Sequence, residues 1–494
     1  MSIKKKLISF GLALCMVMSC SVLASADSRS SNKTDVTLSI KASGVYKNWD
    51  GTSNVAQFID DEGCFCFAYD GTANVTVVKM DKNNEQRKET VLLKKLHPLF
   101  GTVTCDGDGN FYLVTGEENT GDDTSTETIF ISKYDKNGKL IGTIGDNGSS
   151  SLASYFNTTF YTKIPFDAGN CSAAVNGDLL SVHYAREMYS GHQSDSVFTI
   201  NINTLSKVSV GTIYSSHSFA QRVIPFDSGF VYASEGDCYS RAFTINTFKG
   251  SGRSSEQDIF HFWVQKGAFD DYDMYLINNN FAHMGGLAPI SDSLVAFAGT
   301  SVESLNSNAN SEKEGLFVQI FDPTKDLTSA SSYVTEGTRS GLGGPNGDEN
   351  VTDYGVKWLI PSSSSVTAKN PQIVYAGGDT AAVLFECYGM NSSGYDGVYY
   401  IVINSKGEVV QDAECFSKTA RLNPCVMPVY SDGSIYWAGN STSGSAVYSY
   451  KLTVGSKTID DYIKIVNGIT GSGVILTDEQ LEAVEKVLEY DYSK

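Results

Sequence analysis

One local pattern recurs seven times along this chain, and this recurrence limits the folds that the chain can adopt. Each copy is a short run of apolar and aromatic residues, usually behind a turn, and a second apolar run follows most copies. The first runs of the seven copies are residues 64–68, 111–114, 179–182, 230–233, 294–297, 382–385 and 435–438. A spacing of about 45–90 residues between copies is typical of repeat architectures, whose units are small supersecondary structures.

The second copy shows the internal plan of the repeat most clearly. A turn at residues 106–110 precedes the apolar run 111–114, and a polar hairpin leads to the second run. Asn137-Gly138 then separates this run from another strand, and Asn-Gly between apolar strands is a strong hairpin signal because both residues tolerate positive φ. Four short strands per unit make a propeller blade. We therefore predict an all-β protein, a seven-bladed β-propeller over residues 35–455 with a short C-terminal helical appendage.

Composition agrees with this prediction. The 46 glycines, 27 tyrosines and 25 phenylalanines suit an all-β chain with many tight turns. The seven blades are expected at residues 50–95, 98–148, 160–212, 215–263, 278–335, 354–415 and 418–455. Two long polar insertions, residues 301–314 and 336–350, would project from the ring as loops, and such loops often carry function.

The strand–turn–strand segments of two blades resemble those of secreted bacterial β-propellers. In that pattern a strand ending in tyrosine is followed by aspartate, a variable residue, asparagine and glycine. Here Tyr134 is followed by residues 135–138, and the strand 398–403 is followed by a similar turn at 404–407. The resemblance extends over most of the chain. It implies the architecture and no particular activity.

The N-terminal residues have the features of a secretory signal peptide. Three lysines at residues 4–6 precede an apolar stretch, and a small-residue cleavage site follows it. We expect a signal peptide over residues 1–26 and, in consequence, a secreted extracellular protein. Residues 17–20 also loosely match a bacterial lipoprotein box, so lipid anchoring through Cys20 is an alternative. No later run has the length of a membrane-spanning helix, so no membrane span is expected.

The two ends of the predicted propeller have different patterns. Residues 27–34 are polar and are expected to be a disordered lead, whereas residues 36–40 alternate like a strand that closes the ring on the last blade. After residue 455 the pattern changes, and residues 476–488 have apolar residues at helical spacing. We predict a helical segment over residues 456–494, which either docks on the propeller or attaches the protein to a surface.

The acidic balance of the chain excludes some partners. The formal net charge of −19 becomes −22 once the leader is removed, because the leader contains three lysines and no acid. Such a surface repels nucleic acid and anionic lipid, although a local basic pocket is compatible with it. Eight scattered cysteines remain, and we expect most of them to be reduced core residues, with one or two disulfides as the alternative. We expect a monomer.

Histidines and arginines gather in the middle of the chain, in blades three to five. Because inter-strand loops rim the channel of a propeller, adjacent blades would bring these residues towards one mouth. Histidine can serve as acid or base, arginine can hold a carboxylate, and tyrosine can donate a proton or stack on a sugar. The candidate catalytic residues are His192, His217, Tyr189 and Arg222. The candidate ligand-binding residues are Arg186, Gln193, Asp237, Arg241 and His283.

The same combination of residue types is similar to that used by polysaccharide lyases on seven-bladed propellers. In those enzymes histidine, tyrosine and arginine neutralise a uronate and remove a proton from it, and some hold a divalent metal with histidine and glutamine. The alternative is structural: buried histidines and arginines in blades often tie strands together. No metal-ligand motif is present, so no metal site and no cofactor are predicted, and a divalent cation stays an alternative.

These observations lead to three functional hypotheses. The first is extracellular recognition of a glycan or protein ligand through one face of the propeller. The second is a polysaccharide lyase or hydrolase that acts on an acidic polysaccharide. The third is a surface-attachment or assembly protein that works through residues 456–494. Whether the protein is an enzyme is left open by the sequence.

Overall fold

The computed structural model describes most of the predicted propeller. The described residues are 29–36, 53–121, 123–151, 159–167, 169–188, 191–209, 213–236, 242–249, 252–253, 256–262, 282–303, 313–343, 350–389, 394–440 and 445–454. The predicted signal peptide and the predicted C-terminal helical segment lie outside them. In the described part of the chain, no helix has the length and apolarity that crossing a bilayer requires.

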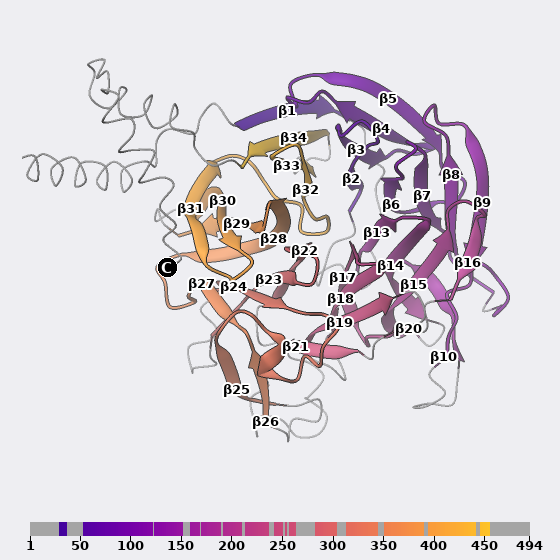
Figure 1. The fold of residues 1–494 in the computed structure, drawn as a ribbon. Helices are drawn as coiled ribbons and strands as arrows, with labels where there is room; N and C mark the ends of the chain where they lie inside the picture. Colours follow the sequence, from indigo (N-terminus) through magenta and orange to yellow (C-terminus); the bar gives the residue numbers. More distant parts are fainter. Residues whose placement is uncertain are drawn as a thin grey trace, which may run out of the picture. The chain divides into compact units, whose positions relative to one another are not determined.

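Residues 30–451 form one compact unit in which seven antiparallel sheets surround a common axis, so the prediction of seven blades is confirmed (Figure 1). The first four blades are β2 (Val55–Ile59), β3 (Phe65–Asp70), β4 (Asn74–Met80) and β5 (Arg87–Lys94); β6 (Leu99–Cys105), β7 (Phe111–Gly116), β8 (Ile129–Tyr134) and β9 (Leu140–Asp146); β12 (Thr162–Pro165), β13 (Cys171–Asn176), β14 (Leu179–Met188), β15 (Gln193–Asn201) and β16 (Ser206–Val208); and β17 (Ser218–Phe226), β18 (Gly229–Gly236), β19 (Ala242–Lys249), β20 (Gly252–Arg253) and β21 (Gln257–His261).

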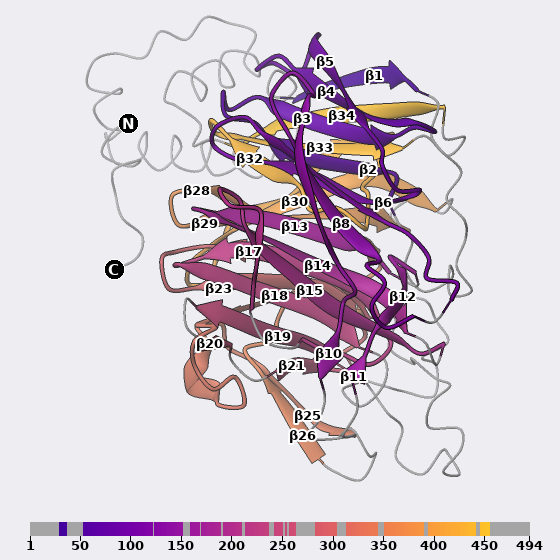
Figure 2. The same cartoon turned by 90° about the vertical axis from the view of Figure 1, so that its right-hand side faces the viewer.

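The remaining blades follow the same antiparallel plan. They are β22 (His283–Pro289), β23 (Val295–Ser301), β24 (Gly315–Phe321) and β27 (Lys357–Ile360); β28 (Thr367–Gly377), β29 (Thr380–Tyr388), β30 (Tyr395–Asn404) and β31 (Val409–Ser417); and β32 (Val429–Ser431), β33 (Ser434–Asn440), β34 (Ala446–Thr453) and β1 (Arg29–Asp35). Two short hairpins, β10 (Ser150–Ser151) with β11 (Thr159–Phe160) and β25 (Thr338–Gly343) with β26 (Asn350–Tyr354), lie outside the blades. Figure 2 shows the blades from the side.

The hydrophobic core lies between neighbouring blades. The innermost strands β2, β6, β13, β17, β22, β28 and β32 each contact the next, and β32 contacts β2, so the ring is closed. One core cluster contains Ala56 of β2, Phe100 of β6 and Leu113 of β7, and therefore joins blades one and two. Because the blade strands are covered on both sides, their buried runs are almost continuously apolar rather than alternating.

The strand that completes the last blade differs from the prediction. It is β1, which pairs with β34 and occupies residues for which we expected a disordered lead, rather than residues 36–40. The sequence of β1 is polar because an outer strand faces solvent and is held by backbone pairing. Side chains also tie it to blade one: Ser30 Oγ donates to the carbonyl of Asn83 at 2.8 Å, and Asn32 Nδ2 to that of Glu85 at 2.6 Å.

The fifth blade also has different boundaries from those predicted. Its fourth strand is β27, which follows the hairpin β25–β26 instead of preceding it. The second long polar insertion, expected as a loop, thus contains an antiparallel hairpin inserted between the third and fourth strands of one blade. The prediction placed residues 354–360 in the sixth blade because a blade interrupted by a hairpin has no regular spacing.

Candidate functional site

Two faces of the ring are distinguished by strand direction. We call the face on which the innermost strands begin the N-face, and the face on which they end the C-face. The N-face carries the connections between blades and the hairpins between second and third strands, because neighbouring strands in a blade are antiparallel. His192 in the hairpin β14–β15, His217 just before β17 and His283 at the start of β22 all lie on the N-face.

The structure brings His192 and His217 together. Their ring centroids are 4.5 Å apart, with 41° between the ring planes, and both residues are half-buried. The backbone N–H of His217 donates to the carbonyl of Gln193 at 2.9 Å, which joins the two turns. His217 has a φ of +49°, a conformation that non-glycine residues rarely adopt and that clusters at functional sites.

His192 is held in a neutral form at neutral pH. Burial lowers its pKa from the ordinary value of histidine. One ring nitrogen, Nε2, lies 2.7 Å from Ser216 Oγ. Gln193 is almost fully buried, and its side-chain amide donates to the carbonyl of Gly191, so Gln193 shapes the turn under His192 instead of facing a ligand.

Arg186 has a structural role. Its guanidinium is fully buried and donates from Nε to Ser194 Oγ at 2.9 Å and from Nη1 to Thr162 Oγ1 at 3.3 Å and to the carbonyl of Gly148. Burial lowers its pKa. The prediction that Arg186 binds ligand is not supported by this geometry, because the side chain of a strand residue points into the sheet interface rather than towards the loops.

Arg222 also has a structural role. Residues 421–427, which we call the axial segment, run from blade six to blade seven, and their carbonyls accept side-chain hydrogen bonds from blades one, three, four, six and seven. Arg222 Nη2 donates to Pro424 at 2.5 Å and Gln57 Nε2 to Met427 at 2.7 Å. The other donors to axial carbonyls are Asn170, Gln372 and Trp437, whose Nε1 donates to the carbonyl of Arg421 at 3.2 Å. Arg222 therefore anchors this segment.

We expect Arg222→Met to lower the free energy of unfolding by about 2 kcal/mol, because it removes the donor of two hydrogen bonds, to the backbone carbonyls of Gln221 and Pro424. Chemical denaturation measures this loss. Ligand binding by the remaining folded protein should be unchanged, and a variant with normal stability but impaired binding would instead favour a direct ligand contact.

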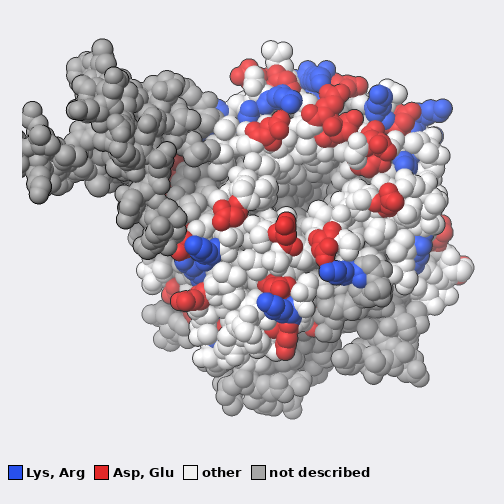
Figure 3. Space-filling model, in the orientation of Figure 1, with Lys and Arg blue, Asp and Glu red and all other residues white. Residues whose placement is uncertain are grey.

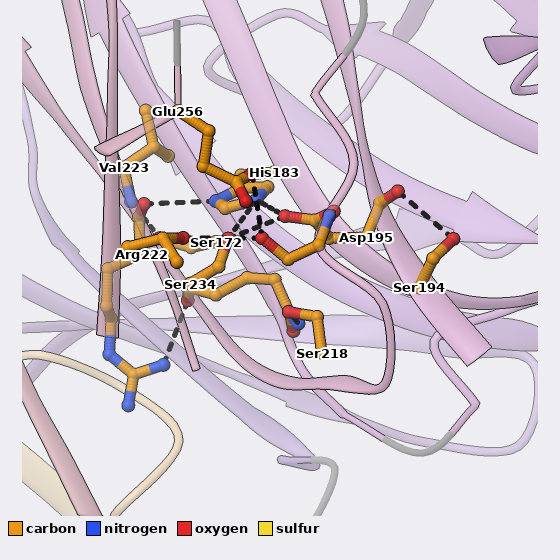
Figure 4. A network of polar contacts seen from close by, with 12 residues as sticks. Ser172, His183, Ser194, Asp195, Ser218, Arg222, Val223, Ser234 and Glu256 are labelled. Atoms are coloured by element: carbon orange, nitrogen blue, oxygen red, sulfur yellow. Dashed lines mark hydrogen bonds and ion pairs between the residues drawn. The ribbon is translucent and has the colours of Figure 1, made fainter. Parts of the chain in front are cut away.

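A buried polar network lies between blades three and four (Figure 4). His183 Nε2 lies 2.9 Å from Asp195 Oδ2, and its Nδ1 lies 3.1 Å from the carbonyl of Arg222. Asp195 also accepts from Ser234 Oγ and from the backbone N–H of Ser215, both at 2.5 Å. Serine, histidine and aspartate meet here, but they are sealed from solvent and the histidine does not lie between the other two, so the network is structural.

The remaining predicted residues do not join the pair. Tyr189, Asp237 and Arg241 lie outside the described residues. His283 makes no hydrogen bond or ring contact with His192 or His217 in the described structure. Desolvation by surrounding protein atoms and, secondly, the charge of Lys369 lower the pKa of its ring to about 4.

Sequence reasoning missed a second group on the N-face, on blades six and seven. It consists of Arg421 with Glu386, Tyr388 and Tyr395. Glu386 is the sequence feature that could have predicted this group, because a carboxylate inside an otherwise apolar strand run requires a buried partner. The identity of the partner was not readable, since Arg421 lies 35 residues further along the chain.

No group of three or more potential metal ligands occurs among the described residues. The described cysteines, Cys64, Cys66, Cys105, Cys171, Cys387, Cys415 and Cys425, are free thiols, whereas Cys238 lies outside the described residues.

Comparisons with known proteins show similarity in fold alone. No protein-family model matches the chain. No curated protein matches it. Among solved structures, the chain is similar to a Trypanosoma rangeli sialidase in complex with the inhibitor DANA, at 10% identity and a TM-score of 0.38, over 75% of this chain and 59% of the sialidase. It is also similar to the Dos1 propeller, at 9% identity and a TM-score of 0.36, over 86% of this chain and 90% of the other.

A third similarity is to the α-L-arabinanase of Cellvibrio cellulosa, at 11% identity and a TM-score of 0.29, over 63% of this chain and 93% of the other. The chain thus spans under two thirds of the length of the sialidase. Similarities at these levels carry no argument about a ligand, which must come from the site itself.

Proposed function

We propose that this protein is an extracellular recognition protein that binds a glycan or protein ligand through its N-face. The observation that carries this proposal is the His192–His217 pair. Two adjoining, half-buried imidazoles, one of them in a strained left-handed turn, offer ring faces and hydrogen-bonding nitrogens to a ligand. Export is supported by the leader sequence at residues 1–26.

One contact favours the alternative, a hydrolase. Ser216 Oγ and His192 Nε2 are at the distance of a nucleophile and its base. However, Ser216 is only 3% exposed, and no described acidic residue hydrogen-bonds the other nitrogen of His192. Recognition therefore accounts for the geometry better than catalysis does. The attachment hypothesis depends on residues 456–494, which lie outside the described residues.

The proposal predicts the effect of His192→Ala. On a glycan array that carries neutral and acidic oligosaccharides, the mature protein should bind at least one glycan. His192→Ala should weaken that binding by about tenfold, as loss of one contact group in a binding site does. Because His192 is neutral above its lowered pKa, wild-type binding should stay constant between pH 7 and 8.

The matched control is His97→Ala. His97 also lies on the N-face, stacked on Phe130 with its Nδ1 3.0 Å from Glu117, but it belongs to the connection between blades one and two. Equal loss in both variants would point to a general effect on the fold. Absence of any bound glycan, or unchanged binding by His192→Ala, would contradict glycan recognition at the pair. Appearance of cleaved or unsaturated sugar products would support the enzymatic alternative.

A further inference from the structure

A second polar cluster on the N-face has the features of a ligand site. We call it the Arg421 cluster: Arg421, Glu386, Tyr388, Tyr395 and Lys369. Tyr388 ends β29, Tyr395 begins β30, and Lys369 lies near the start of β28. Arg421 begins the axial segment that links blades six and seven. Four of the five residues thus lie near strand ends on the N-face, and Arg421 lies in the connection that follows β31 on the same face.

The guanidinium of Arg421 is fixed in position while part of it stays free. Its Cζ lies 3.2 Å from the centroid of the Tyr395 ring, and Nη1 lies 3.3 Å from Glu386 Oε2 and 3.5 Å from the Tyr388 hydroxyl. The side chain is nevertheless 45% exposed. Among the described residues, Nε and Nη2 have no hydrogen-bond acceptor, and these two donors form the edge that binds a carboxylate bidentately.

Lys369 places a second cation beside the same aromatic group. Its Nζ lies 5.9 Å from the centroid of the Tyr388 ring and is 3.9 Å from Glu314 Oε1. The side chain of Lys369 is 37% exposed. Tyr388 therefore has Arg421 near its hydroxyl and Lys369 near its ring, and it packs edge-on against Tyr395 with ring centroids 5.3 Å apart.

The cluster presents positive charge to solvent because its carboxylates are buried. The side chains of Glu386 and Glu314 are 3% and 2% exposed. Glu386 also accepts hydrogen bonds from the Tyr388 hydroxyl at 2.8 Å and the backbone N–H of Leu422 at 3.0 Å, so it does not depend on Arg421 alone. The exposed groups that a ligand meets first are a guanidinium and an ammonium.

The C-face has the opposite character. Every turn between the first and second strands of a blade carries an exposed aspartate there, namely Asp61, Asp108, Asp178, Asp227, Asp292, Asp379 and Asp432. The face drawn in Figure 3 carries both acidic and basic side chains around a central hollow. The Arg421 cluster is by contrast a local group of exposed cations in an acidic protein.

We propose that the Arg421 cluster binds the carboxylate of a uronate residue in an acidic polysaccharide. The Nε and Nη2 groups of Arg421 hold the carboxylate, Lys369 adds charge, and the tyrosines provide flat surfaces beside the sugar ring. This inference rests on the proposed function, since it names the ligand class of the N-face, but it uses residues separate from the His192–His217 pair.

The test is titration calorimetry of the mature protein with a galacturonate oligomer and with its neutral methyl ester. The acidic oligomer should bind, its methyl ester should bind at least about tenfold more weakly, and affinity should fall with salt because the contacts are ionic. Arg421→Gln and Lys369→Gln should each weaken binding of the acid, by about tenfold and about threefold. Lys249→Gln, at an exposed ion pair with Asp227 away from the N-face, should leave binding unchanged.

Several results would overturn the inference. Equal affinity for the acid and its ester, unchanged affinity in Arg421→Gln, or absence of binding would each do so. Dextran sulfate is a further arm: if it alone binds with dependence on Arg421, the ligand is a sulfate ester and the uronate assignment is wrong. If Arg421→Gln does not fold, Lys369→Gln tests the same site independently. Binding of neutral glycans that depends on His192 would keep the proposed function while this inference fails.

Discussion

Asp195→Ala is expected to lower the free energy of unfolding by about 3–5 kcal/mol, the usual cost of breaking a buried ion pair by removing one partner. Both ring nitrogens of His183 face oxygen atoms: Nε2 faces Asp195 Oδ2 and Nδ1 faces the carbonyl of Arg222. Removing the carboxylate leaves that ring, the Ser234 hydroxyl and the Ser215 N–H without their acceptor in a site that water does not reach.

Denaturant unfolding measures this loss, with Asp178→Ala as the matched control because Asp178 is exposed in the nearby turn before β14. The double variant with His183→Ala should lose less than the sum of the two single losses, because each side chain is costly mainly when its partner is missing. A loss below about 1 kcal/mol in Asp195→Ala would show that the network is not a buried ion pair.

The same carboxylate predicts acid sensitivity. Burial would raise the pKa of Asp195, but the hydrogen bonds and charge of His183, with those from Ser234 and Ser215, outweigh burial and hold the pKa below its ordinary value. A depressed pKa contributes stability that is present above the unfolded value of about 3.8 and is lost as pH falls through the folded value.

The second large effect is an alkaline loss of stability that depends on His261. This residue ends β21 and joins the hairpin β25–β26 to blade four. Its Nδ1 lies 2.6 Å from Asp353 Oδ1 and its Nε2 3.2 Å from Asp258 Oδ2. Arg339 donates from Nη1 to Asp353 at 2.8 Å and to the His261 carbonyl at 3.0 Å. Burial alone would lower the pKa of His261, but the two carboxylates raise it to about 9.

The direction of this pH dependence follows from the linkage between protonation and folding. A group whose pKa is raised by folding stabilises the protein fully below its unfolded value, near 6.5, and loses that effect as pH rises to about 9. The difference between the folded and unfolded pKa values of His261 corresponds to a stabilisation of about 3 kcal/mol at most. Wild type and His261→Gln should therefore differ most at pH 6, and the gap should shrink between pH 6.5 and pH 9.5. Unfolding curves at several pH values measure it, and a gap that stays constant would contradict the ion pairs described here.

The repeat was predictable because each blade repeats the same local chemistry. Apolar runs such as residues 111–114 are buried on both sides, and turns such as Asn137-Gly138 separate them, so both signals are local in the sequence. The closing strand was not predictable in the same way. β1 has no apolar alternation, since its contacts are backbone pairing and hydrogen bonds to a turn about 53 residues away.

The site was predictable in part. Topology alone placed His192 and His217 on neighbouring blades at one face, and their rings are in contact. The arginines could not be assigned from sequence, because a shift of one residue along a strand turns a side chain to the opposite face. Arg186 and Arg222 turn inwards, whereas Arg421, which has no motif around it, remains half-exposed.

The axial segment has a consequence for how the protein assembles during folding. The side chains that donate to the axial segment come from earlier parts of the chain: Gln57, Asn170, Arg222 and Gln372 of blades one, three, four and six. Their acceptor carbonyls lie between blades six and seven and are therefore added to the chain later. The half-built molecule must keep these amides and this guanidinium hydrated until residues 421–427, in about the last sixth of the 494-residue chain, have been added. We therefore expect water to leave the centre of the ring late in folding, when the axial segment docks against these donors.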